Sequence, residues 1–111
     1  MEIDAVDKLV FRVIEQVAAD NCDFDKVIKS VVFFSKEHAL SQEILLKLLF
    51  IFDKESMYRE KYVISRACAS LFPGKVREDA LMEAGKTAFR LGFYELAVRE
   101  FKEMLQQNPQ N

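Results

Sequence analysis

The hydrophobic positions of this chain recur with the spacing of one helix face. Near the C-terminal end, Ala97, Phe101 and Leu105 lie four residues apart and continue one apolar stripe. Glycine and proline are scarce, with three and two copies, whereas an all-β protein of this length would need many more turn residues. We therefore expect an all-α protein with six helices, at about residues 3–19, 23–37, 41–53, 56–71, 76–91 and 94–107.

Capping and breaking residues support these helix ends. Asp23 and Ser41 precede apolar helical segments and are suited to N-capping, because their side-chain oxygens can accept from free backbone N–H groups. Gly92 tolerates the left-handed backbone that ends a helix, so the next helix is expected to begin at Tyr94. Pro109 is expected to stop that helix.

A repeat pattern accounts for the last 34 residues, Glu78 to Asn111. Gly85 is expected where two helices approach closely, and Ala97 where the second helix packs on the first. The segment resembles the tetratricopeptide repeat family through Leu81, Ala84, Gly85, Ala97, Phe101 and Pro109. It departs from the family pattern at Ala88, where an aromatic residue is usual.

The same register extends backward in a degenerate form. It predicts units at about residues 8–41, 42–77 and 78–111, with two residues inserted near Gly74. Phe24 and Tyr58 then occupy the position of Tyr94, while Lys61 stands where the family has alanine. The resemblance implies one domain over residues 1–111, built of three antiparallel helix pairs stacked as a short right-handed solenoid.

Composition and charge narrow the functional classes. Half of the residues are hydrophobic and 31% are charged, which is a globular balance. The net charge of −2 argues against a general nucleic-acid binder. Acidic residues nevertheless dominate residues 1–25 and basic residues dominate 26–77, so a helical-repeat nucleic-acid binder stays as an alternative, using the basic middle with Lys26, Lys29, Lys36, Lys47 and Lys54.

No set of residues indicates catalysis. His38 is the only histidine, and its predicted place near a helix C-terminus suits interaction with the helix dipole. Cys22 and Cys68 have no metal-ligand spacing; we expect reduced thiols, although the sequence leaves a disulfide between them open. There is no glycine-rich phosphate loop. We therefore expect no enzyme activity, no cofactor and no metal site.

The sequence also lacks signals for membranes or secretion. Its longest apolar run, Leu48 to Phe52, is too short to span a bilayer, and the acidic N-terminus does not resemble a signal peptide. We expect a soluble, cytoplasmic protein.

In the tetratricopeptide family, the first helix of each pair lines a concave groove. This resemblance implies a partner-binding site at Leu46, Phe50, Met82, Lys86, Phe89 and Arg90. Such a groove would suit an amphipathic helix or an extended peptide with acidic groups. The alternative is that its apolar residues pack between neighbouring helices.

The expected function is therefore a non-catalytic adaptor or chaperone that binds a segment of another protein. A three-unit chain of this size is similar to the type III secretion needle-subunit chaperones, while a tetratricopeptide fragment of a larger scaffold or co-chaperone is an alternative. Leu96, Val98 and Leu105 are expected on an uncapped outer face, where a homo- or hetero-oligomeric partner could bind.

Overall fold

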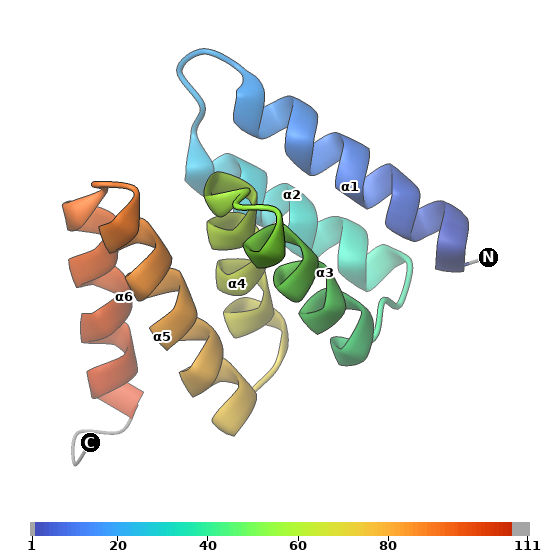
Figure 1. Ribbon diagram of the computed structural model, residues 1–111. Helices are drawn as coiled ribbons and strands as arrows, with labels where there is room; N and C mark the ends of the chain where they lie inside the picture. The colour runs from blue at the N-terminus through green and yellow to red at the C-terminus, as the bar shows by residue number, and fades with distance from the viewer. Residues whose placement is uncertain (1, 108–111) are drawn as a thin grey trace.

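The computed structural model describes residues 2–107, and this part of the chain is entirely helical, with six helices and no strand (Figure 1). Every predicted helix is present, and each end lies within two residues of its predicted position. The predicted stop at Pro109 falls outside the described residues. The helices are α1 (Glu2–Ala18), α2 (Phe24–Glu37), α3 (Gln42–Lys54), α4 (Tyr58–Leu71), α5 (Lys75–Arg90) and α6 (Tyr94–Gln107).

The predicted capping residues are confirmed. The Asp23 carboxylate accepts hydrogen bonds from the backbone N–H groups of Asp25 and Lys26, and Ser41 Oγ accepts one from Ile44. These bonds satisfy donors that have no partner inside the first turn of a helix. Gly92 has φ of +82°, a backbone conformation that favours glycine, and so allows the short turn between α5 and α6.

Helix α4 lies at the centre of the molecule. It contacts α1, α2, α3 and α5, whereas α6 packs its backbone mainly on α5 (Figure 1). Residues 62–65 and 67–69 of α4 are all buried, which means that this helix is enclosed on nearly every side. The buried faces of the other helices pack around it and make one continuous apolar core.

The close approach predicted at Gly85 is confirmed. A Cβ atom at this position would lie 2.5 Å from Cε1 of Phe101, so the aromatic ring occupies the space that a side chain would need. Ala97 is also buried in the contact between α5 and α6, as its small size predicts. The last two helices are therefore packed through a glycine on one side and an alanine on the other.

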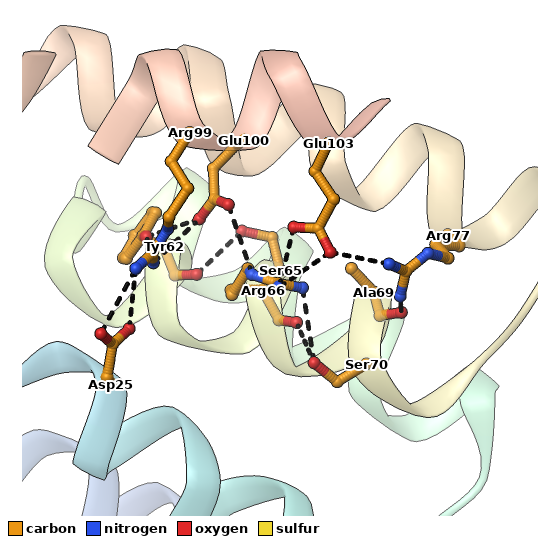
Figure 2. Close-up of polar contacts among 10 residues, drawn as sticks. All are labelled: Asp25, Tyr62, Ser65, Arg66, Ala69, Ser70, Arg77, Arg99, Glu100 and Glu103. Carbon is orange, nitrogen blue, oxygen red and sulfur yellow. Dashed lines mark hydrogen bonds and ion pairs between the residues drawn. The ribbon is translucent and has the colours of Figure 1, made fainter. Parts of the chain in front are cut away.

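Polar side chains join α6 to α4. Glu100 is fully buried, and its Oε2 accepts a hydrogen bond of 2.6 Å from the Tyr62 hydroxyl. Its Oε1 lies 3.3 Å from Arg66 Nε. Figure 2 shows Glu100 and Glu103 pointing from α6 toward these α4 groups. A buried carboxylate is costly unless it is paired, so these contacts fix how α6 sits on α4.

The same polar cluster continues to two further helices. Arg99 of α6 forms an ion pair with Asp25 of α2 at 3.1 Å. Glu103 lies 2.9 Å from Arg66 and 2.8 Å from Arg77 of α5 (Figure 2). Charged groups from α2, α4, α5 and α6 thus form one network.

The predicted outer face of α6 needs one correction. Val98 and Leu105 are exposed as expected, but Leu96 is half-buried and packs against the core. Successive residues in a helix are about 100° apart, so positions 96 and 98 point about 200° apart. They cannot share one face of α6, and the prediction for Leu96 is wrong.

Candidate partner-binding groove

Helices α3 and α5 run in the same direction (Figure 1). Two cavities lined by both helices make a groove between them. At one end, a cavity of about 110 Å³ is lined by Leu46 and Leu49 of α3 together with the α5 segment 76–83. At the other end, a cavity of about 340 Å³ brings Asp53 near Lys86 and Arg90 of α5. The N-terminal halves of α3 and α5 therefore face each other at one end of the groove, and their C-terminal ends face each other at the other end.

Lys61 of α4 lines the larger cavity, which we call the polar end of the groove. Its side chain is only 11% exposed, and its Nζ lies 2.8 Å from Asp53 Oδ1 and 3.2 Å from Glu83 Oε2. Burial by itself would lower the pKa of Lys61, but hydrogen bonds to the two carboxylates outweigh burial and raise it. The hydrogen bond from Lys61 lowers the pKa of Asp53. The ammonium group of Lys61 on α4 therefore links a carboxylate of α3 to a carboxylate of α5.

Two further cations stand at the rim of this polar end. Lys86 and Arg90 are exposed, and neither forms an ion pair with another described residue. The guanidinium carbon of Arg90 lies 4.2 Å from the ring centroid of Tyr58, a distance suited to a cation–π contact. Tyr58 thus holds Arg90 in place while leaving its charge available to an incoming anion.

Apart from Asp53, the α3 side of the groove is apolar. Leu46 lines the cavity shared with α5, and Phe50, one turn further along, is 68% exposed. These two residues and Ile51 also border a shallow hollow on the surface of α3. A single exposed apolar residue is common, but three neighbouring ones on one helix make a continuous apolar surface.

The structure separates the six predicted site residues into two groups. Leu46, Lys86 and Arg90 line the groove cavities, and Phe50 borders the neighbouring hollow on α3 together with Leu46. Phe89 instead packs edge-on against Tyr94 of α6, with ring centroids 5.3 Å apart.

Met82 is half-buried against the core and lines neither groove cavity. Met82 and Phe89 are seven residues apart, two helical turns, and so share a side of α5. On that side, Phe89 is 62% exposed and contacts Tyr94 of α6, a contact that the resemblance by itself could not show.

The sequence did not indicate that Lys61, Tyr58 and Glu83 belong to the polar end of the groove. Lys61 did stand out, because it replaces the small alanine expected at that position of the repeat. In the structure, this long side chain fills the space between α3 and α5 with a charge and two ion pairs. A departure from a repeat pattern was therefore the available signal for the polar end of the groove.

The cysteines are both free thiols, which answers the question of a disulfide. Cys68 is fully buried, and burial raises the pKa of its thiol to about 12. Over residues 2–107, no three His, Cys, Asp or Glu side chains are placed to hold a metal ion together. In the same range, no helix combines the length and the apolar character needed to cross a lipid bilayer.

No protein-family model, curated protein or solved structure matches this chain. The groove and its chemistry are therefore the basis for assigning a function.

Proposed function

We propose that this chain is a non-catalytic protein-binding module of tetratricopeptide type. Its ligand is a segment of another protein that presents apolar side chains to Leu46 and Phe50 and acidic side chains to Lys86 and Arg90. The observation that carries this proposal is the exposed apolar surface of α3, which continues through Leu46 into the groove where the unpaired cations lie.

The arrangement of charges supports an acidic ligand. Asp53 and Glu83 already share Lys61, so the nearest carboxylates are occupied within the protein. Lys86 and Arg90 are left as the charges that a partner meets first. A carboxylate that pairs with a charged donor contributes more than a neutral hydrogen bond, and the adjacent apolar surface contributes by burial.

Several features support the tetratricopeptide assignment. Each odd-numbered helix is followed by the helix that packs against it, and α3 and α5 run parallel at the groove. Gly85 and Ala97 occupy the close contact of the last pair, as the family pattern requires. We propose that the helix pairs form a short right-handed solenoid, and that the chain acts as a small chaperone similar to those that hold type III secretion needle subunits.

The first prediction tests the charge of the ligand. The probes are amphipathic helical peptides with leucine on one face and glutamate along its edges, paired with peptides in which lysine replaces each glutamate. We expect the acidic peptides to bind and the basic peptides not to bind. The double variant Lys86→Glu/Arg90→Glu should weaken binding of the acidic peptides by about 10- to 100-fold, because two charge-assisted contacts become repulsive. Fluorescence anisotropy measures both affinities.

The control is Lys29→Glu/Lys36→Glu on α2, which changes the net charge by the same amount away from the groove. It should leave the affinity within about threefold, since long-range effects of exposed charges are screened by salt. Phe50→Ala should weaken binding through the apolar contact alone. Equal binding of acidic and basic peptides, or equal losses in the α2 control, would contradict the proposal.

A further inference from the structure

A second exposed apolar surface lies on α6, apart from the groove. Tyr94, Val98 and Leu105 are 60%, 51% and 45% exposed, and Phe101 between them is half-buried. We call these four residues the α6 stripe. Phe89 of α5 extends the stripe at one end, because its ring contacts that of Tyr94.

The α6 stripe faces away from the body of the molecule. On the other side of α6, Glu100 and Glu103 point toward α4 (Figure 2). Within the stripe, the ring of Phe101 also packs on Gly85 of α5, while the other three side chains are exposed. Helix α6 forms one edge of the molecule (Figure 1). Four apolar residues at helical spacing on such an edge make a contiguous patch, which is the kind of surface that marks a protein interface.

The spacing of the α6 stripe reads the same in both directions. The intervals between Tyr94, Val98, Phe101 and Leu105 are four, three and four residues. This alternation is that of a helix–helix seam. If two copies of α6 lie antiparallel, Tyr94 of one meets Leu105 of the other, and Val98 meets Phe101. An interface around a two-fold axis must be self-complementary in this way.

The charges beside the α6 stripe have the same symmetry. Glu95 and Lys102 are seven residues apart and so lie along one edge of the stripe; both are exposed, and neither forms an ion pair with another described residue. In an antiparallel pair, the same edges of the two helices face each other. Glu95 of one copy then lies opposite Lys102 of the other, and the contact occurs twice. A parallel pair would instead bring opposite edges of the two helices together, so Glu95 and Lys102 would not meet across the interface.

We propose that the α6 stripe pairs with the α6 stripe of a second copy of this chain, with the two helices antiparallel. Four apolar side chains per copy make a small interface, so the dimer is of micromolar strength and reversible. This interface uses a surface other than the groove, so the proposed dimer does not depend on the proposed binding function.

The first experiment measures molar mass by sedimentation equilibrium, over chain concentrations from about 1 µM to about 1 mM. We expect a reversible change from one to two chains. Val98→Glu should leave a monomer, because it places two carboxylates in the apolar seam. The control is Phe33→Glu on α2, which charges an apolar residue that is 69% exposed elsewhere and should leave the dimer intact. Circular dichroism checks that each variant keeps its helices. A monomer at every concentration, or a dimer that Val98→Glu leaves unchanged, would overturn the proposal.

A charge exchange tests the antiparallel direction. Glu95→Lys and Lys102→Glu, each alone, put like charges opposite each other and should raise the dimer Kd by roughly tenfold at low salt. The double variant Glu95→Lys/Lys102→Glu restores opposite charges and should return the Kd to its original value. If the double variant is as weak as the single ones, the antiparallel pairing is wrong. Lys86→Glu/Arg90→Glu should leave the dimer unchanged, and Val98→Glu should leave peptide binding unchanged, so failure of one proposal is distinguishable from failure of the other.

Discussion

At the residue scale, Cys68 shows how the centre of the fold controls chemistry. It lies on α4, fully buried, and the enclosing side chains raise the pKa of its thiol from 9.0 to about 12. A thiolate is needed for reaction with disulfides and alkylating agents, so this thiol is inert in the folded protein. Cys22 is half-buried, and burial also raises the pKa of its thiol. Neither thiol is activated as a nucleophile.

The raised pKa of Cys68 predicts a loss of stability in alkaline solution. The unfolded chain releases the thiol proton near pH 9, while the folded chain retains it until about pH 12. The stabilisation from the buried neutral thiol is therefore complete below pH 9 and is lost as the pH rises toward 12, by at most about 1.4 kcal/mol per pH unit. Urea unfolding at pH 7, 9 and 10.5 measures this.

The matched variant for this prediction is Cys68→Ala. Burial and the Glu100 hydrogen bond raise the pKa of Tyr62 as well, and that contribution is present in both proteins. The difference between the two pH profiles therefore isolates Cys68. Parallel profiles above pH 9 would show that burial does not hold the thiol neutral.

At the scale of elements, the pair α5–α6 depends on one close contact. Exchange of glycine for alanine inside a helix normally stabilises by about 0.5 to 1 kcal/mol. At Gly85, the added methyl group would meet the Phe101 ring at 2.5 Å, so the ring or the whole of α6 must shift. The steric term outweighs helix propensity because a packed interface has little room to relax.

We therefore predict that Gly85→Ala lowers the free energy of unfolding by about 1 to 3 kcal/mol. Chemical denaturation of the single and double variants provides the measurement. As a single substitution, Phe101→Leu should lower the free energy of unfolding. Combined with Gly85→Ala, it should relieve the clash, so the effects of the two substitutions should not be additive. A stabilising Gly85→Ala would show that α6 moves away without cost.

At the scale of the whole molecule, the buried polar network joins the last helix pair to the rest of the fold. The backbone of helix α6 approaches that of α4 at few points. The two helices are nevertheless joined by side chains, because Glu100 binds Tyr62 and Glu103 binds Arg66. Arg99 of α6 also binds Asp25 of α2. Because the network spans four helices, damage to it should reduce the stability of the entire domain and not only that of α6.

We predict that Glu100→Gln lowers the free energy of unfolding by about 3 kcal/mol, because the amide keeps the shape but turns donors toward Arg66. Thermal unfolding followed by circular dichroism should stay a single transition at a lower midpoint. Glu15→Gln, at an exposed position of α1, should change stability by less than about 0.5 kcal/mol. A variant at Glu100 as stable as this control would mean that the network contributes little.

Local interactions explain why the helices could be predicted so well. The side chains of Asp23 and Ser41 bond to backbone groups two or three residues away, and Gly92 needs only its own φ angle. Such signals are complete within a few residues of sequence. Gly85 and Ala97 could be predicted as packing positions because a repeat pattern carries the contact between its own two helices.

The candidate site depended on contacts that no local pattern contains. Lys61 gains its role from Asp53 on α3 and Glu83 on α5, and the sequence showed only that a lysine had replaced an alanine. Phe89 and Lys86 are three residues apart, so the sequence placed both in one groove. In the structure, Phe89 contacts Tyr94 of α6, whereas Lys86 lines the cavity shared with α3.

The sequence by itself thus determined the six helices, their ends and the tight contact between α5 and α6. Each of these follows from interactions between residues close in the chain. The tertiary structure alone decided that α4 is enclosed at the centre, that Glu100 is buried in a charged network, and that the surfaces of α5 and α6 divide into a groove and a stripe. The physical reason is that burial and pairing of charge depend on which helices become neighbours, and packing of the whole chain settles that.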